Sequence, residues 1–270
     1  MNNFAIIVDC GNTNVSIGIF KEHKFYARID IPSSLNAINN SLPRLLAFKD
    51  KYHLHNSDVK GGLISSVVPS LNNSIITLIK ECFDIILPIM DGTYKYDIEI
   101  NVDNPKEVGG DLLADAIAGK ELCKSPCLII DLGTITKVIV LDEKSKFIGT
   151  SFFPGVETSV KSMKEKTALL PEIDVKKKPS NILGTNTIDA MECGIYYGTL
   201  GLINHTASLI DNMFKNKKVT KVLTGGNSSL FKGDAKDFIV DPNFVLKGIY
   251  LIYINNWGRY YELWRFIKKL

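Results

Sequence analysis

Short apolar runs that end in small polar residues recur along this chain of 270 residues. The run Ala5–Val8 leads into Asp9 and then into a polar turn ending at Asn14, after which a second apolar stretch begins. The same order returns from Cys127 to Thr136, where Asp131 stands 122 positions after Asp9 (131 minus 9). Each copy predicts a buried strand, a tight polar turn and a returning strand.

The polar turns also carry candidate chemistry. Glycine lets the backbone turn where a side chain would clash, and Asp, Asn and Thr present oxygens and free amides that can hold phosphate or a hydrated metal ion. A single Asp-x-Gly turn is more often an ordinary hairpin turn. Two copies with matching flanks predict a duplicated domain with nucleotide bound between the halves.

Elsewhere the pattern alternates between strand and helix periods. Strands are expected at 25–31, 61–69, 85–87, 147–153 and 221–223, with a hairpin over 129–142. Helices are expected at 41–55, 71–83, 157–169 and 188–211, and a further helix begins near Asp111 and runs through Ala118. This alternation is typical of α/β domains, and we expect two of them, at 1–118 and 119–270.

Two further segments keep alternative interpretations. The tail 257–270 is aromatic and basic, with Trp257, Tyr261 and Trp264 on one helical face. It fits a terminal helix docked on its own chain or on a second subunit, or a helix at a membrane surface. The basic stretch Lys176–Lys178 fits a solvated loop.

Composition narrows the class of protein. The chain is 45% hydrophobic and 23% charged, with a net charge of +3, which gives no reason to expect nucleic acid as a partner. No run of about 18 apolar residues occurs, so we expect no membrane partner and a cytoplasmic location. Five cysteines without a Cys-x-x-Cys pair argue against a disulfide framework or a zinc site.

Four clusters remain as candidates for function: the Asp9 turn, the helix start at Asp111, the Asp131 turn and the strand exit Thr224–Gly226. The chain has neither a Walker-type nor a Rossmann-type phosphate loop. Backbone amides of the two turns would therefore hold phosphate. Phosphoryl transfer needs positioning, charge neutralisation and a base, and the three aspartates could divide these tasks.

In this order the clusters resemble those of one known family, the type III pantothenate kinases of the acetate and sugar kinase, Hsp70 and actin superfamily. The resemblance covers about residues 4–250. The matching stretches are Asp9–Asn14, Ser65–Pro69, Asn104–Asp111, Asp131–Thr134, Pro154–Gly155, Gly184–Thr187 with Gly194 and Gly198, and Thr224–Gly226.

The resemblance implies an α/β fold of two duplicated ribonuclease H-like (actin-like ATPase) domains, with the nucleotide cleft between them. It implies ATP with Mg²⁺ as cofactor, pantothenate as the second substrate, and a homodimer. The phosphate loop would consist of Asp9, Cys10, Gly11, Asn12, Thr13, Asn14, Val15 and Ser16. Asp9 would lie near magnesium, and Thr134 would contact ATP.

The remaining roles follow from the same resemblance. Asp111 would be the catalytic base, although as a residue at a helix start it also fits a plain cap. Asp131 would coordinate a monovalent cation, K⁺ or NH₄⁺, and Thr224–Gly226 would lie beside the nucleotide. Pantothenate would contact Gly109, Gly110, Asp111, Leu112 and Thr187, the last from the partner subunit unless it serves only as an N-cap.

Three positions depart from the family pattern. Leu112 stands where the family usually has arginine, which leucine cannot replace as a fixed charge. Lys137 follows Thr136 where a run of threonines is usual, and Val102 replaces an aromatic residue. In the repeat Lys137 aligns with Val15, so it either restores a charge in the cleft or faces solvent.

These observations favour phosphorylation of pantothenate by ATP, the first step toward coenzyme A. Two alternatives stay open. A non-catalytic binding protein would resemble the Bvg accessory factor-like members proposed to assist transcription, and the missing arginine favours it. A kinase for another small hydroxyl compound is favoured by the more apolar Val102 and Leu112.

Overall fold

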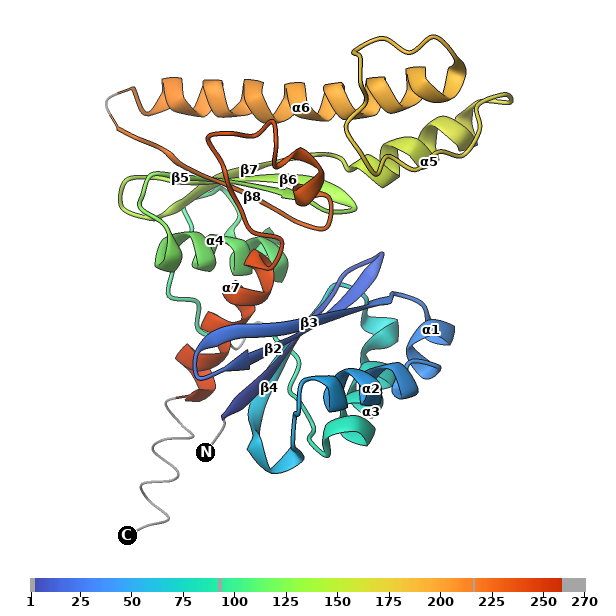
Figure 1. The fold of residues 1–270 in the computed structure, drawn as a ribbon. Coiled ribbons are helices and arrows are strands. Elements are labelled where there is room, and N and C mark those ends of the chain that lie inside the picture. The colour runs from blue at the N-terminus through green and yellow to red at the C-terminus, as the bar shows by residue number, and fades with distance from the viewer. Residues whose placement is uncertain (1–2, 92–93, 216, 259–270) are drawn as a thin grey trace. The chain divides into compact units, whose positions relative to one another are not determined.

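The computed structural model describes residues 3–91, 94–215 and 217–258 (Figure 1). The chain forms two compact units, each built on its own sheet. The first unit combines Met1–Asp97, Val108–Ile117 and Val245–Leu270, and the second combines Ile98–Glu107 and Ala118–Phe244. This division differs from the single boundary expected after residue 118, because the C-terminal segment returns to the first unit.

The first unit contains a four-stranded sheet in the order β3-β2-β1-β4. β1 pairs antiparallel with β2 and parallel with β4. The strands are β1 (Phe4–Cys10), β2 (Asn14–Lys21), β3 (Lys24–Pro32) and β4 (Val59–Ser66). The helices are α1 (Leu35–Asn39), α2 (Leu42–Lys51), α3 (Asn72–Phe83), the first part of α4 (Gly110–Leu122) and α7 (Phe244–Tyr253).

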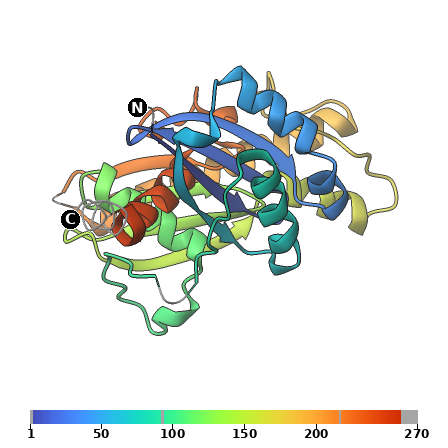
Figure 2. The ribbon, with the colours of Figure 1, turned by 90° about the horizontal axis from the view of Figure 1, so that it is seen from below.

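Alternation along the strands gives this sheet two apolar faces. Ile6, Val8 and Ile17 belong to a core that is completed by side chains of α1, α2 and α3. These helices lie on one side of the sheet (Figures 1 and 2). Burial of an aliphatic side chain of this size contributes about 1.5–3 kcal/mol, so this core is a main source of the stability of the unit.

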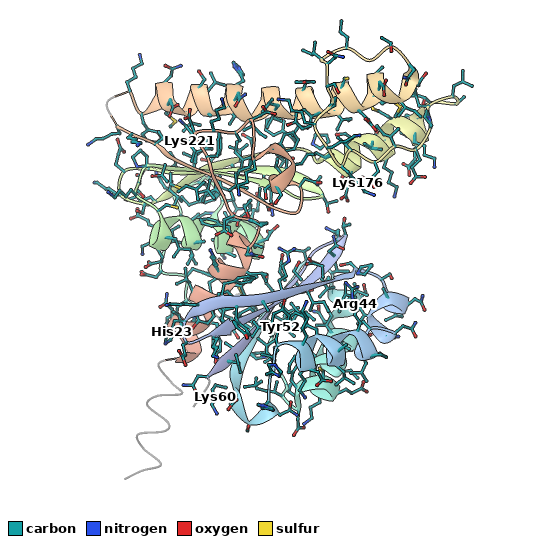
Figure 3. The ribbon with its side chains drawn as sticks, in the orientation of Figure 1. His23, Arg44, Tyr52, Lys60, Lys176 and Lys221 are labelled. Carbon is teal, nitrogen blue, oxygen red and sulfur yellow. The ribbon has the colours of Figure 1, made fainter. Side chains whose placement is uncertain are left out.

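Helix α7 covers the opposite face of the same sheet. The ring of Tyr250 stacks on Phe20 with centroids 4.2 Å apart, and its hydroxyl lies 2.7 Å from Nδ1 of His23 in the β2–β3 turn, which Figure 3 labels. A Cβ atom at Gly18 would lie 3.1 Å from Leu246. The small residue on β2 thus lets the helix approach, which explains why the C-terminal segment joins the first unit.

The second unit repeats the arrangement with one more strand, in the order β7-β6-β5-β8-β9. The strands are β5 (Cys127–Leu132), β6 (Ile135–Leu141), β7 (Phe147–Pro154), β8 (Thr220–Thr224) and β9 (Ile239–Val240). Helices α5 (Val156–Lys166) and α6 (Thr187–Met213) contribute to the core on one face, with Leu128, Ile130 and Val138 from the sheet. Gly119 of α4 packs against Ile129 and Leu141 on the other face.

The shared strand order confirms the duplicated α/β fold expected from the sequence. Within the described residues the first sheet has no fifth strand, although one was expected at 85–87. There the chain forms a single bridge between Ile64 and Ile89, with Ile64 N–H donating to the carbonyl of Pro88. Pro88 has no N–H to donate, which limits the pairing at this edge.

The other expected elements are present with small shifts at their ends. The helix expected over 41–55 ends at Lys51, whereas α4 extends four residues beyond Ala118, to Leu122. The sequence pattern did not predict β9, which has only two residues. Most of the aromatic tail, residues 259–270, lies outside the described part of the chain, and none of the described helices is both long and apolar enough to cross a membrane.

The close approach of α7 and α4 yields a stability prediction. A Cβ atom at Gly248 would lie 1.9 Å from the carbonyl oxygen of Ala114, which is backbone and cannot turn away. We expect Gly248→Ala to lower the free energy of unfolding by about 3 kcal/mol, measured by urea denaturation.

Gly201 is the matched control, because it also lies inside a helix but has open space around the position of a Cβ atom. Gly201→Ala should be neutral or stabilise by up to about 1 kcal/mol, since alanine favours the helix. Equal destabilisation by both changes would show that the contact between α7 and α4 is not tight.

Candidate functional site

Polar side chains form one row across the first sheet. Asp9 on β1 lies opposite Ser16 on β2 and opposite Ser65 on β4, and Ser16 in turn lies opposite Asp30 on β3. Residues directly opposite one another in a sheet point to the same face. The strand register thus places Asp9 in the middle of a polar row, which we call the Asp9 row.

The turn that follows Asp9 is fixed by its own backbone and by β3. Gly11 N–H donates to the carbonyl of Asn14 over 3.0 Å, and Ser33 binds the turn twice, donating its hydroxyl to Gly11 O (2.6 Å) and its N–H to Thr13 O (2.9 Å). Asn12, Thr13 and Asn14 are exposed. Their amides are therefore held in place at a surface that an anion can reach.

Two residues of the expected phosphate loop point their side chains into the core. Cys10 and Val15 are both buried. Burial raises the pKa of the Cys10 thiol, more than the hydrogen bond with Ser66 lowers it. The thiol therefore stays protonated at neutral pH, and Cys10 and Val15 can offer a ligand only their backbone.

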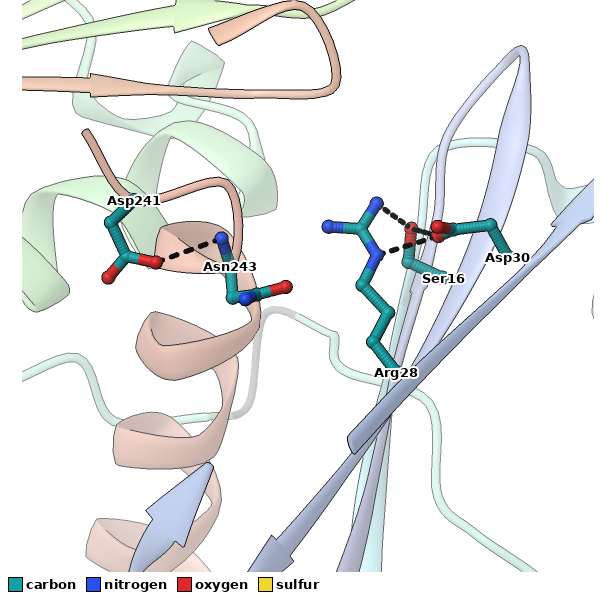
Figure 4. Close-up of polar contacts among 5 residues, drawn as sticks. All are labelled: Ser16, Arg28, Asp30, Asp241 and Asn243. Atoms are coloured by element: carbon teal, nitrogen blue, oxygen red, sulfur yellow. Dashed lines mark hydrogen bonds and ion pairs between the residues drawn. The ribbon is translucent and has the colours of Figure 1, made fainter. Parts of the chain in front are cut away.

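Arg28 adds a fixed positive charge to the Asp9 row (Figure 4). Its Nε atom lies 2.7 Å from the Asp30 carboxylate, and its Nη2 atom donates to Ser16 Oγ over 2.9 Å. Ser16 donates onward to Asp30 over 2.7 Å. The sequence reading missed Arg28, although the alternation of β3 places residues 28 and 30 on one face.

Figure 4 also shows a separate turn at the start of α7. Asn243 N–H donates to the Asp241 carboxylate over 3.0 Å. This is a local capping contact at the beginning of the helix that covers the first sheet.

The start of α4 lies against the same sheet. A Cβ atom at Gly110 would lie 3.7 Å from Ser65 Oγ and 2.5 Å from Met90 Cε, and one at Gly109 would lie 2.9 Å from Asp111 Oδ1. The two glycines therefore leave room for Met90 and for the Asp111 carboxylate. Through Ser65 the structure brings the first turn of α4, with Asp111, to the row that contains Asp9.

Asp111 itself is half-buried in the first turn of α4. Its carboxylate accepts a hydrogen bond from Leu112 N–H over 2.9 Å, which holds it at the start of the helix. Leu112 is only 5% exposed, so its side chain packs in the interior. One turn later on the same helical face, Asp115 is fully buried, and the sequence reading missed it.

A corresponding polar row crosses the second sheet. Asp131 on β5 lies opposite Lys137 on β6 and opposite Thr224 on β8. Nζ of Lys137 lies 2.5 Å from Oδ2 of Asp131, and the two side chains are only 13% and 9% exposed. The second row thus contains a largely buried ion pair, which we call the Asp131–Lys137 pair.

The strand exit at Thr224–Gly226 closes over this pair. Gly225 has φ +88°, and a Cβ atom there would lie 2.3 Å from Oδ1 of Asp131 and 2.6 Å from the backbone of Leu132. The hydroxyl of Thr224 is buried and finds no hydrogen-bond partner among the described residues. Only glycine permits Gly225 to lie so close to Asp131, which explains the glycine in the Thr224–Gly226 motif.

The register corrects the alignment of the two repeats. Asp9 pairs with Ser16, seven residues later, whereas Asp131 pairs with Lys137, six residues later. The second turn is one residue shorter, so Lys137 corresponds to Ser16 and not to Val15. Its side chain therefore lies beside Asp131 and does not face solvent.

The residues around Asp131 do not fit the expected K⁺ or NH₄⁺ ion. Such an ion needs oxygen ligands, and one carboxylate oxygen of Asp131 is bound to an ammonium group while the other lies against Gly225. Two unit positive charges 4 Å apart repel by about 4 kcal/mol at an effective dielectric constant of about 20.

Mg²⁺ needs fewer ligands from the protein than such a monovalent ion does. It keeps several waters and binds through one or two carboxylates together with phosphate oxygens. Asp9, half-buried beside the exposed turn, fits that role. No group of three or more His, Cys, Asp or Glu side chains in the described ranges forms a metal centre by itself.

The second turn is held by the segment after β7. Gly155 N–H and the Thr158 hydroxyl both donate to the carbonyl of Thr134, over 3.1 and 2.5 Å. A Cβ atom at Gly155 would lie 2.1 Å from Gly133 O, so glycine is required. Helix α5 therefore begins at the turn that contains Thr134.

Next to α5 lies an open pocket of about 710 Å³. It is lined by apolar and charged side chains of α5, by residues 172–175 and by Asn227, which follows the Thr224–Gly226 exit. Its size and mixed lining suit a small organic ligand.

Thr187 is the first residue of α6 and is exposed. The cap is Asn186, whose side chain accepts a hydrogen bond from Asp189 N–H over 3.0 Å, so the alternative of Thr187 as N-cap is wrong. A Cβ atom at Gly184 would lie 2.1 Å from Ala190 N, which packs this motif onto the first turn of α6.

Comparison with known proteins agrees with this arrangement. A family model described as type III pantothenate kinase matches residues 5–208. The type III pantothenate kinase of Dehalococcoides mccartyi is 32% identical over 258 residues, which cover 95% of this chain and 99% of that protein. The enzyme of Listeria innocua is 32% identical over 256 residues, covering 93% and 97%.

Solved structures share the fold at low identity. A putative 2-dehydro-3-deoxygalactonokinase from Sinorhizobium meliloti superposes with a TM-score of 0.55 at 14% identity, over 94% of this chain and 97% of that one. A conserved putative Baf family transcriptional activator from Campylobacter jejuni gives a TM-score of 0.54 at 14% identity, over 93% and 98%. With a family model over most of the chain and nearly full-length relatives at 32% identity, the chain belongs to the type III pantothenate kinase family.

Proposed function

We propose that this type III pantothenate kinase transfers the γ-phosphoryl group of ATP to the primary hydroxyl of pantothenate, giving 4′-phosphopantothenate. The observation that carries the proposal is the meeting, at Ser65, of the Asp9 row and the first turn of α4. A fixed anion-binding turn and a carboxylate at a helix start are two parts that phosphoryl transfer to an alcohol requires.

In this proposal the phosphates of ATP bind the amides of the exposed residues Asn12, Thr13 and Asn14. Mg²⁺, held by Asp9 and phosphate oxygens, supplies charge neutralisation when bound. Arg28 already neutralises Asp30, which would otherwise repel phosphate from the same row. The site thus keeps its acidic residues without excluding an anionic substrate.

Asp111 takes the proton of the attacking hydroxyl. The hydrogen bond from Leu112 N–H holds this carboxylate in the first turn of α4. Gly109 and Gly110 are assigned to the acceptor through their backbone, and Leu112 contributes its amide to the Asp111 carboxylate, because its side chain is in the core. The Leu112 side chain therefore contributes to packing.

The second unit binds the rest of ATP. We assign the adenosine to the pocket between α5 and Asn227. This pocket lies next to the Thr224–Gly226 exit and to the start of α5, where Gly155 binds the Thr134 turn. Its apolar members Val156, Val160 and Ile173 would face the base. The protein works in the cytoplasm, a proposal consistent with five cysteines that form no disulfide within the described residues.

Replacement of the base tests the mechanism directly. Asp111→Asn keeps the shape of the side chain but cannot accept a proton, so turnover should fall by about 10²–10⁴-fold while ATP affinity stays within about twofold. Turnover is measured as phosphopantothenate formed, and affinity by calorimetry. Glu121→Gln, an exposed carboxylate at the far end of α4, is the control and should have normal turnover.

Near-normal turnover in Asp111→Asn would show that Asp111 only caps the helix and that the base lies elsewhere. A wild type that binds ATP but phosphorylates no acceptor would favour the non-catalytic alternative. Transfer to a different small alcohol but not to pantothenate would favour the alternative acceptor.

The homodimer is a further part of the proposal. Four large apolar side chains around the α5–α6 connection are exposed: Leu169, Ile182, Leu183 and Ile188. A group of exposed apolar residues at one end of a helix pair is typical of a protein interface. Thr187 stands among them, which supports its assignment to a site shared between subunits.

Leu183 provides the test of this interface, since it is 78% exposed. A charged side chain at the centre of this interface would lose its water when the dimer forms. Leu183→Lys should therefore convert the dimer to a monomer in sedimentation velocity. Leu35→Lys, at an exposed leucine of the first unit, should leave the dimer intact. A monomeric wild type, or a dimer unaffected by Leu183→Lys, would contradict the proposal.

A further inference from the structure

A positive charge that belongs to the chain lies at Asp131, in the place expected for a monovalent cation. The ammonium group of Lys137 lies 2.5 Å from Asp131 Oδ2, and the pair is enclosed on its other side by Gly225. We propose that this ammonium group takes over the role of the monovalent cation, so that the enzyme needs neither K⁺ nor NH₄⁺. This inference rests on the proposed kinase function and specifies its ion requirement.

The geometry follows from strand pairing. Lys137 lies directly opposite Asp131 in the β5–β6 ladder, and cross-strand partners of this kind stand about 4.5–5.5 Å apart at Cβ. A lysine at this position therefore reaches the carboxylate without leaving the sheet. The contact depends on the six-residue spacing set by the shorter turn.

The burial of Lys137 and the charge of its ammonium group also support this role. A lysine that faced solvent would keep its head group in water, but the Lys137 side chain is only 13% exposed. An ammonium group is a compact point charge with three N–H donors, so it can bind oxygen atoms as a small cation does. Asp131 accepts one of these donors.

Lys137 occupies the expected place of the monovalent cation, but the oxygen ligands around that place are still present. The carboxylate of Asp131 and the buried hydroxyl of Thr224 remain as oxygen ligands. Shortening Lys137 to threonine would remove the tethered charge and leave a space lined by oxygen. That space should then accept K⁺ or NH₄⁺ from solution.

The first experiment uses the wild-type protein. Phosphopantothenate formation and ATP affinity are measured at equal ionic strength in the chlorides of potassium, ammonium, sodium and tetramethylammonium. We expect rates and affinities within about twofold in all four salts. Activation of the wild type by K⁺ or NH₄⁺ of tenfold or more over tetramethylammonium would overturn the proposal.

The second experiment compares Lys137→Thr with Lys221→Thr. Lys221 is a matched control, because it lies on the neighbouring strand β8, pairs with Asp211 at 2.7 Å and is 12% exposed (Figure 3). Lys137→Thr should lose at least tenfold in ATP affinity and turnover in tetramethylammonium and regain most of it with K⁺. Lys221→Thr should respond to the four salts as the wild type does.

Thermal unfolding of the same proteins gives a readout that does not depend on activity. K⁺ should raise the unfolding temperature of Lys137→Thr above its value in tetramethylammonium, and should have no such effect on the wild type or on Lys221→Thr. If Lys137→Thr does not fold, Lys137→Arg keeps the charge and should stay independent of K⁺.

The outcomes separate this inference from the proposed function. A wild type without kinase activity in any salt, but with ATP affinity independent of K⁺, would contradict the function and support the tethered cation. An active wild type with strong dependence on K⁺ would support the proposed function and contradict the tethered cation. A Lys137→Thr protein that is as active as the wild type in tetramethylammonium would show that Lys137 has no such role.

Discussion

Strand register within the two hairpins is the constraint on which the rest of the site depends. In each sheet one inner strand, β1 or β5, carries an aspartate one residue before its end, and pairing with both neighbours places polar side chains beside it. A shift of one residue would turn every side chain of a strand to the opposite face. The apolar cores on the other face prevent that shift, because it would remove Ile6 and Val8, or Leu128 and Ile130, from the cores that they fill. Core packing and site chemistry are therefore fixed by the same register.

Glycines allow the segments around the two polar rows to lie close together. Gly110 meets Ser65, Gly155 meets the Gly133–Thr134 turn, and Gly225 meets Asp131. At each of these points a Cβ atom would meet neighbouring atoms, so a larger residue would push a segment of the site away. The short family motifs are thus the contacts that hold polar turns, helix starts and strand exits together.

The two rows use charge differently. In the first sheet Arg28 neutralises Asp30 and leaves Asp9 in the middle of the row, next to exposed amides. In the second sheet Lys137 binds the central aspartate itself. Duplication therefore preserved the backbone arrangement of the two sheets while the charged residues of the two rows diverged.

The sequence alone determined the strand–turn–strand repeats, most helices and the identity of Asp9, Asp111 and Asp131 as candidate residues. These follow from local rules, since alternation, glycine turns and helix starts act over a few residues. Only the tertiary structure decided that α7 returns to the first sheet, that Arg28 joins the Asp9 row and that Lys137 binds Asp131. Each of these depends on contacts between segments distant in sequence or on a turn one residue shorter. Local pattern does not encode the length at which a turn closes, and that length decided which residue faces the aspartate.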